Sequence, residues 1–290
     1  MDRHTSLGEA RTRHLCRTFD LSRQALHAAG KPRSAPKPRA PRLGPWTDAE
    51  TLQKAIQRVV DEGPAWGVLK VWAILKDEGL VASRRRIYAL MKAMGLLLPS
   101  SCAGREPATR GHVVVPESNR RWATDLTTVW TRQDGLVAVI PVVDCGDRYC
   151  FDARVSRSQE SHPVLDPVRH ALVAQFASPE GIPAGLELRT DHGPQYTGGD
   201  CFAFCEDWRI DHTYAPVGRP TGNAVAERLI QTMKLECIWL RDWDSAADLQ
   251  AALDAWRHKY NHRRPHQALA WLTPAAKRTQ NLAKANQATA

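Results

Sequence analysis

The pattern of apolar residues changes near residue 115, and this change most limits the folds open to the chain. The stretches WATDLTTVW and VAVIPVVD have the β-branched composition of strands, RQDG between them is a predicted turn, and FDARVS continues as a third strand. Helical and strand patterns then alternate: a helix over about 163–176, a strand ending near Asp191, a helix near 199–209, the strand HTYAPV, and a long helix from about 223. This order predicts an α/β domain built on one sheet.

Three acidic residues mark the ends of these predicted elements. Asp125 lies in the strand-like run RWATDLT, Asp191 follows a short apolar run and precedes a Gly-Pro turn, and Glu227 opens the long helix. If the fold brings them together, their hard oxygen ligands suit Mg²⁺ or Mn²⁺. Two such ions about 3.5–4 Å apart would clamp the attacking and leaving oxygens of a phosphoryl displacement. Acids at strand ends also occur by chance in a chain of this length, so the assignment depends on the motifs around them.

Four motifs in fixed order carry a resemblance to a known family. They are RWATDLT around Asp125, RTDHGPQY around Asp191, YAPVGRPTGNAVAERLIQTMKLE from Tyr214 to Glu236, and YNHRRPHQALAWLTP from Tyr260 to Pro274. Together they resemble the catalytic domain of DDE transposases related to retroviral integrases. Within that group the chain is most similar to the insertion-sequence-three family, in which the transposase is split between two reading frames. The resemblance covers about 115–275.

The resemblance implies a fold and a set of site residues. Residues 115–275 are expected to form an RNase H-like, retroviral-integrase-like catalytic domain in which Asp125, Asp191 and Glu227 ligate Mg²⁺ (or Mn²⁺), with two ions expected. It implies cleavage and joining of DNA strands without a covalent protein intermediate, and it assigns a DNA phosphate contact to Lys234. Asn223 falls on the same helical face as Glu227 and Lys234, at about 100° per residue, and is included as a DNA-binding residue.

A smaller all-α domain is predicted before the catalytic domain, over 47–100. Three amphipathic helices are expected, the first beginning at Thr47 or Asp48 and the third capped by Ser83. The third opens with Arg84, Arg85 and Arg86, and cations in a first turn oppose the helix dipole. Phosphates would compensate them, so this helix predicts a DNA-binding helix–turn–helix, which the family also has; an exposed basic turn is the alternative.

The remaining segments are less informative. Residues 1–30 predict a short helical N-terminal segment, and 31–46 a basic, Pro-rich linker that either tracks phosphates or is a solvated tether. Residues 276–290 predict a flexible tail. Arg263 and Arg264, in NHRRPH, either contact DNA or belong to a structural cap. Asp144, at the end of the second long strand, is a candidate supporting group for the metal ligands.

Composition adds limits on partners and compartment. The chain has 40 Lys and Arg against 31 Asp and Glu, a formal charge of +9, which suits a polyanionic partner. No apolar run is long enough to span a bilayer, and the N-terminus lacks the apolar region of a signal peptide, so no membrane partner is expected. The seven cysteines, without a signal peptide, predict reduced thiols in a cytoplasmic protein. The resemblance to insertion-sequence transposases implies a bacterial, nucleoid-associated one. Cys201 and Cys205, one helical turn apart among aromatic residues, predict core packing rather than a metal site.

These observations favour a transposase that cleaves DNA at the ends of an insertion sequence and transfers the strands, which is DNA integration and recombination. The expected partners are DNA, both terminal repeats and target duplex, further copies of the chain on that DNA, and a first-reading-frame protein as fusion or partner. An RNase H-like nuclease and a DNA-binding regulator derived from an inactive transposase are the alternatives. A serine or tyrosine recombinase would need a protein nucleophile that no motif recommends.

Overall fold

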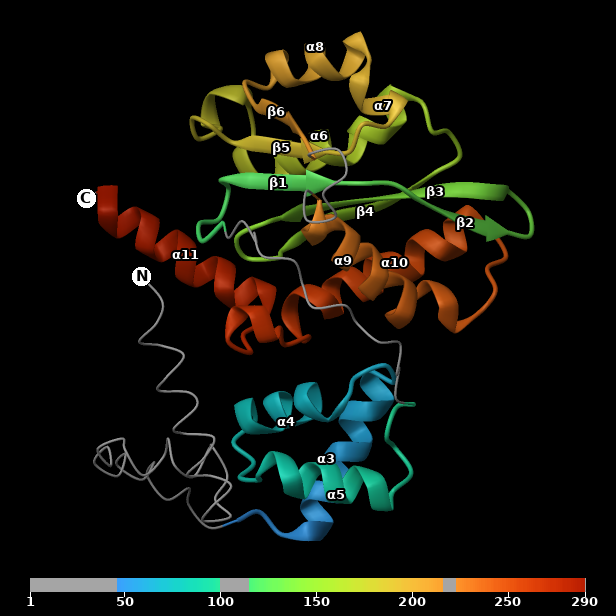
Figure 1. Cartoon of the computed structure of the whole chain (residues 1–290), viewed down its shortest axis with the longest axis vertical. Coiled ribbons are helices and arrows are strands. Elements are labelled where there is room, and N and C mark those ends of the chain that lie inside the picture. Colours follow the sequence, from blue (N-terminus) through green and yellow to red (C-terminus); the bar gives the residue numbers. More distant parts are fainter. Residues whose placement is uncertain (1–45, 100–114, 216–222, 290) are drawn as a thin grey trace, which may run out of the picture. The chain divides into compact units, whose positions relative to one another are not determined.

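The computed structural model of the 290-residue chain describes residues 46–99, 115–215 and 223–289. The predicted helical segment 1–30 lies outside these residues, as does the predicted linker 31–46 apart from Trp46. The described chain forms a helical domain and an α/β domain, with the elements labelled in Figure 1. In the described ranges no helix is both long and apolar enough to cross a membrane.

The helical domain contains the three helices that the sequence predicts, α3 (Ala49–Glu62), α4 (Val68–Asp77) and α5 (Arg84–Ala93). Asp48 caps α3 by accepting a bond from the Thr51 amide (2.8 Å), and Ser83 caps α5 by accepting one from the Arg86 amide (3.2 Å). The apolar stripes meet in a core of their own, made of Leu52, Ile56, Val59, Trp66, Val71, Ile74, Leu75, Ala82, Ile87 and Met91.

The α/β domain is built on one six-stranded sheet. Its strands are β1 (Arg121–Thr124), β2 (Thr127–Thr131), β3 (Gly135–Asp144), β4 (Cys150–Ser156), β5 (Glu187–Thr190) and β6 (Asp211–Tyr214). Both β1 and β2 run antiparallel to one edge of β3, and β4 pairs with its other edge. β5 is parallel to β1, and β6 is parallel to β5. The sheet thus reads β4, β3, β1 with β2, β5, β6, in agreement with the predicted RNase H-like fold.

The stretch predicted as one strand, WATDLTTVW, is interrupted at Asp125 and Leu126. β1 pairs with β3 up to Thr124 opposite Val142, and β2 resumes at Thr127 opposite Val139. Pro141 lies in the part of β3 that faces the gap. Its carbonyl accepts a hydrogen bond from the Thr124 hydroxyl (2.9 Å), so this carbonyl points toward β1. The N–H and C=O groups of one residue point to the same edge of a strand, so the backbone nitrogen of Pro141 also faces that edge. Proline has no N–H to offer there, so the ladder opens beside Asp125.

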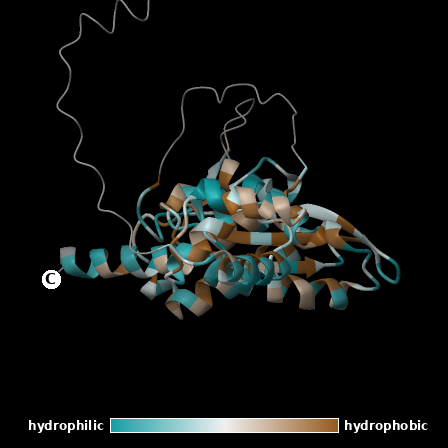
Figure 2. Cartoon of the chain, turned by 90° about the horizontal axis from the view of Figure 1, so that it is seen from below, coloured by the Kyte–Doolittle hydropathy of each residue, from teal (hydrophilic) through white to brown (hydrophobic). Residues whose placement is uncertain are grey.

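Alternation along the strands gives the sheet two apolar faces, each covered by helices (Figures 1 and 2). One face presents Trp122, Ile140 and Val142 to α6 (Ser161–Phe176), α7 (Pro194–Thr197) and α8 (Gly199–Asp207). The opposite face presents Ala123, Val139 and Val143 to α9 (Ala224–Glu236) and α10 (Ala246–His262). Short 3₁₀ turns lie at Pro179–Gly181, Ile238–Leu240 and Gln267–Leu269.

The end of the chain differs from the sequence expectation. Instead of a flexible tail over 276–290, the structure has helix α11 (Pro274–Thr289). Arg278 is only 7% exposed and pairs with two fully buried carboxylates, Asp144 (3.2 Å) and Asp147 (2.9 Å), while Asn281 donates to the Pro116 carbonyl (3.1 Å). The helix is held because those acids would otherwise be buried without a counter-charge. Asp144 therefore has a structural role. It lies opposite Trp122, near the start of β1, whereas Asp125 follows Thr124 at the other end of that strand.

Candidate active site

Asp125 lies at the point where β1 leaves the sheet. Its carboxylate is half-buried and accepts a bond from the Leu126 amide (2.8 Å), which orients it at the gap opposite Pro141. Because Thr124 bonds through its hydroxyl to Pro141, the residue before the carboxylate is fixed to the central strand while Asp125 itself is free of the ladder. The local fold thus exposes one carboxylate at an otherwise fully paired part of the sheet.

Asp191 lies beside it, one residue past the end of β5. The parallel pairing sets Arg121 opposite Glu187 and Ala123 opposite Arg189. The same register, continued two residues further, sets Asp125 opposite Asp191. The Asp191 carboxylate accepts a bond from the Gly193 amide (2.9 Å), so the Gly-Pro turn that the sequence showed after Asp191 orients its side chain.

Glu227 is in the first turn of α9 and is exposed. Ala226, Leu229 and Met233 hold α9 against the sheet. Asn223, the residue before α9, is 5% exposed, and its amide donates to the Thr124 carbonyl (3.1 Å). This bond joins the start of the Glu227 helix to the residue that precedes Asp125. A DNA contact, which the sequence predicted for Asn223, is not what this geometry offers, because the amide is buried against β1.

Electrostatics link the three acids. The pKa of Asp125 is raised to about 6, first by burial of the carboxyl and further by the negative charges of Asp191 and Glu227. The Leu126 amide and the Lys234 ammonium act in the opposite direction. Asp191 and Glu227, which the sequence placed on another strand and on a helix, therefore both act on Asp125 in the folded chain. The site accumulates negative charge in a half-buried position, which a cation would relieve.

Lys234 lies on the same helix as Glu227 and is half-buried. Its ammonium lies 5.9 Å from the centroid of the exposed Trp239 ring, and its charge is felt at Asp125. A cation between the acids and an exposed aromatic ring is suitably placed to contact a phosphate next to the site.

Tyr196 is a residue of the site that the sequence analysis did not single out. Its ring is fully buried, and Asp125 and Asp191 both raise the pKa of its hydroxyl, after the larger effect of burial. Its carbonyl accepts the Tyr214 hydroxyl from β6 (3.1 Å). The available signal was its position in HGPQY, five residues after Asp191, where the chain turns into α7. Tyr196 therefore lies close enough to both acids to sense their charges.

The predicted DNA-binding arginines of α5 are at the start of that helix. Arg84 and Arg85 are exposed and Arg86 is half-exposed. The Arg84 guanidinium stacks over the Trp72 ring at 4.3 Å and lies 6.0 Å from the Trp271 ring centroid. Arg84 is therefore already engaged with aromatic rings, while in the described residues Arg85 has the more open position.

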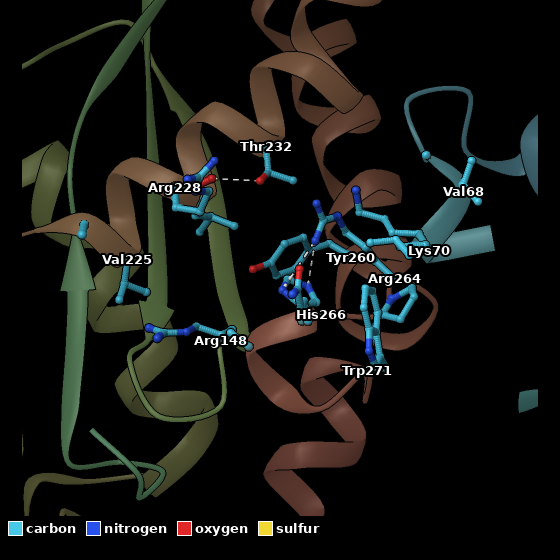
Figure 3. Close-up of a pocket in the computed structure, with 17 residues that line it drawn as sticks. Val68, Lys70, Arg148, Val225, Arg228, Thr232, Tyr260, Arg264, His266 and Trp271 are labelled. Carbon is cyan, nitrogen blue, oxygen red and sulfur yellow. Dashed lines mark hydrogen bonds between the residues drawn. The ribbon is translucent and has the colours of Figure 1, made fainter. Parts of the chain in front are cut away.

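Arg263 and Arg264 are both ion-paired. Arg263 bonds Glu62 (3.0 Å) and Glu78 (2.5 Å), and Arg264 bonds Glu236 (2.9 Å). These contacts favour the structural alternative for the two arginines over direct DNA contact. Arg264 also borders a pocket of about 970 Å³ whose labelled lining residues include Lys70, Arg148 and Arg228 (Figure 3). Burial, with the positive charge of Arg264 as a second cause, lowers the pKa of Lys70.

Comparison with known proteins places the chain in a family. Two models described as integrase core domains match residues 115–220 and 208–274, and one described as an HTH-like domain matches 47–101. The transposase for insertion sequence element IS629 of Shigella sonnei is 30% identical over 236 residues, 77% of each chain. The transposase InsD for insertion element IS2 of Escherichia coli is 28% identical, over 79% of this chain and 78% of that protein. A solved chain of the simian T-cell lymphotropic virus intasome has 18% identity and a TM-score of 0.45, covering 73% of this chain and 70% of that one.

The two integrase core matches overlap and span the sheet, the acids and α9, and the HTH-like match coincides with α3, α4 and α5. A 30% identical relative covers more than two thirds of the chain. The chain belongs to the DDE transposases of insertion sequences, in the insertion-sequence-three family, with an integrase core domain preceded by an HTH-like domain.

Proposed function

We propose that the chain cleaves DNA at the ends of an insertion sequence and joins the freed 3′-OH to a target duplex, with Asp125, Asp191 and Glu227 holding two Mg²⁺ or Mn²⁺ ions. One observation supports this most: the end of β1, the end of β5 and the first turn of α9 bring three carboxylates together so that two of them raise the pKa of the third. Family membership makes DNA transposition the reaction to which this site belongs.

The residues present fit a hard divalent cation. All three donors are carboxylates, and burial, followed by the charges of Asp191 and Glu227, raises the pKa of Asp125 to about 6, so that a bound cation would relieve an unfavourable charge there. A bound divalent ion would favour the charged form of every ligand. When bound, such ions would polarise the phosphoryl oxygens and lower the pKa of an attacking hydroxyl.

The chain's own residues contribute position and charge. Asp125 is oriented by the Leu126 amide and Asp191 by the Gly193 amide, so neither carboxylate depends on a flexible side-chain partner. Asn223 fixes the start of α9 and hence Glu227 relative to Asp125. Lys234 would hold a phosphate beside the acids. Tyr196 has a buried hydroxyl with a raised pKa, which makes it unsuited to act as a covalent nucleophile.

The DNA contacts outside the acids are also a proposal. Arg85 and Arg86 at the start of α5 would bind phosphates of the element end, and the helical domain would hold that end while the catalytic domain acts. Further copies of the chain would assemble on the DNA, and a first-reading-frame protein, fused or separate, would complete the active complex. These partners follow from the family and from the basic charge of the chain.

A strand-transfer assay tests the proposal. Labelled element ends carrying a free 3′-OH are incubated with target duplex, Mg²⁺ or Mn²⁺ and, where needed, the first-frame partner. Joined products are expected from the wild type, and none from Asp125→Asn, Asp191→Asn or Glu227→Gln, while all three still bind DNA. Asp254→Asn, an acid in a surface ion pair of α10, is the matched control.

The assay also separates the alternatives. Degradation without joining, abolished by the same substitutions, would mean a nuclease. DNA binding with neither cleavage nor joining under any metal would mean a regulator derived from an inactive transposase. Joining by any of the three variants at the wild-type level would remove that residue from the metal site.

A further inference from the structure

Two cysteines and a histidine meet on the sheet edge next to the catalytic acids. Cys201 and Cys205 lie one turn apart on α8, so their side chains share a face of the helix. His212 is on β6, the last strand of the sheet on that side. One ligand atom from each residue lies within 4.8 Å of the other two. Both cysteines are buried, at 0% and 4% exposed, as the sequence predicts, but the prediction of core packing in place of a metal site took no account of His212.

The connection between α8 and β6 holds these groups in place. Arg209 adopts a left-handed conformation (φ 52°), and the Ile210 amide donates to the Cys205 carbonyl (3.0 Å). A left-handed residue followed by an amide that bonds back to the last helical turn is a common helix ending, and it directs the chain straight into the next element. The cluster is therefore formed by a short connection between two regular elements, and its ligand atoms are positioned before any ion binds.

A hydrogen bond leaves one nitrogen of His212 free to bind an ion. His212 Nε2 lies 3.0 Å from the Thr190 hydroxyl oxygen, and that hydroxyl donates its proton to the Asp191 carbonyl (2.9 Å). The Thr190 oxygen thus accepts from Nε2–H, which leaves Nδ1 with its lone pair free. Nδ1 is 3.9 Å from the Cys201 sulfur and Nε2 is 4.0 Å from it, so a small rotation of the ring would be needed to direct the Nδ1 lone pair at an ion beside the sulfur. Metal-binding histidines commonly donate their second nitrogen in this way.

The distances suit a tetrahedral ion of borderline softness. Zinc–sulfur bonds of about 2.3 Å and zinc–nitrogen bonds of about 2.0 Å place tetrahedral ligand atoms roughly 3.5–3.8 Å apart. The Cys201–His212 separation needs only a few tenths of an ångström of adjustment to reach that value.

We infer that Cys201, Cys205 and His212 form a zinc site, separate from the carboxylate site, in which water completes the coordination. Sulfur and imidazole ligands favour Zn²⁺ over the Mg²⁺ that carboxylates take, so the two sites differ in the metal they select. Zinc here would tie α8 to β6. Through the His212–Thr190 bond it would also stabilise the end of β5, one residue before Asp191.

Metal content tests the inference. The protein, freed of any histidine tag and carrying Asp125→Asn to disable the carboxylate site, is dialysed against zinc and then against a weak chelator. About one zinc ion per chain is expected by mass spectrometry. Cobalt substitution should give the intense near-ultraviolet absorption of thiolate bound to Co²⁺. Cys201→Ala, Cys205→Ala and His212→Gln should each lose both signals, and Cys237→Ala, a buried cysteine in the opposite core, should keep them.

A second measurement covers the case in which the cysteine variants fail to fold. Zinc should protect Cys201 and Cys205 of the Asp125→Asn protein from alkylation, as read by peptide mass spectrometry, and a strong chelator should remove that protection while leaving Cys237 unchanged. Zinc retention by His212→Gln, a cobalt spectrum without thiolate absorption, equal alkylation with and without zinc, or a disulfide between Cys201 and Cys205 would each overturn the zinc site.

Discussion

Asp125 and Asp191 leave two neighbouring parallel strands in the same register, each one residue beyond the end of its strand. Strands that run in the same direction end at the same edge of a sheet, so a carboxylate after each strand lies next to the other. Glu227 reaches this edge because Asn223 bonds the start of α9 to Thr124. Two strand ends and one helix start therefore define the site, although the three residues are far apart in the sequence.

The repulsion among the acids predicts a pH effect on the metal-free protein. Burial and the neighbouring acids raise the pKa of Asp125 to about 6 in the folded state, above the ordinary value in the unfolded chain. The folded state then binds more protons than the unfolded state between about pH 4 and 6, so stability should fall as pH rises through that window. Asp125→Asn should remove this loss and raise the free energy of unfolding at pH 7 by on the order of 1–3 kcal/mol.

Denaturant unfolding at several pH values, with chelator and with Mg²⁺, measures this effect. Mg²⁺ should stabilise the wild type at pH 7 and much less at pH 5, because the ligands must be ionised. The control is Asp254→Asn. Identical pH profiles for wild type and Asp125→Asn would show that the carboxyl titrates normally.

Asn223 is expected to act by position. Asn223→Ala removes the bond to Thr124 and should reduce strand joining by roughly 10–100-fold while the affinity for element ends stays unchanged. Gel-shift and joining assays on the same preparation measure the two quantities. Weaker DNA binding with normal turnover of the bound complex would instead support the DNA contact that the sequence predicted.

The start of α5 predicts a salt effect. Arg85→Gln and Arg86→Gln should each reduce the slope of log affinity against log salt by about 0.9 if each arginine contacts a duplex phosphate. Arg84→Gln should in addition lower thermal stability, because that guanidinium stacks on Trp72. Lys92→Gln, at the other end of α5, is the matched control. Unchanged slopes for Arg85 and Arg86 would mean that this turn is merely solvated.

Lys234 should affect joining more than binding. Lys234→Ala removes one phosphate contact beside the acids, and a misplacement of ~1 Å can reduce the rate by about 100-fold. Single-turnover joining with pre-cleaved ends gives the rate, and Lys234→Arg should restore much of it. Exposed Lys284→Ala on α11 controls for a general loss of charge. A joining rate for Lys234→Ala equal to that of the wild type would leave this lysine without a catalytic role.

Arg278 should be a stability residue. Arg278→Met leaves Asp144 and Asp147 buried without their counter-charge, which should cost about 3–5 kcal/mol in the free energy of unfolding. Removal of residues 274–290 should have a similar effect. Lys284→Met on the same helix should be nearly neutral. Denaturant midpoints compare the variants, and a truncated protein as stable as the full chain would restore the flexible tail that the sequence predicted.

Local signals in the sequence were sufficient for most of the fold. The caps Asp48 and Ser83 accept bonds from the amides of Thr51 and Arg86, as their side-chain chemistry predicts. The order of strands and helices, and the positions of Asp191 and Glu227 at element ends, also follow from local composition, whereas the end of β1 before Asp125 does not, because WATDLTTVW reads as one strand.

Contacts between distant segments account for what sequence reasoning missed. The segment after Pro274 has no apolar stripe that would predict a packed helix. Arg278 holds a helix there because it pairs with Asp144 and Asp147, which lie more than 130 positions earlier in the chain. In the same way, the buried Asn223 side chain donates a hydrogen bond to the Thr124 carbonyl of β1, a contact that the local sequence does not show. His212 joins Cys201 and Cys205 only because β6 returns beside α8. A prediction based on one face of a helix, or on residue spacing within one element, cannot include partners that come from distant segments of the chain.

Pro141 has a consequence for how the site tolerates change. Since the missing N–H belongs to the partner strand, residue 125 owes the ladder no hydrogen bond, whatever side chain it carries. A substitution at position 125 therefore breaks no hydrogen bond from β3, and its local cost is the bond that the Asp125 carboxylate accepts from the Leu126 amide. Under the proposed function, a copy of such a gene that lost its acid here would keep its strand pairing, which would give mobile elements a short route from active enzyme to inert competitor for the same DNA ends.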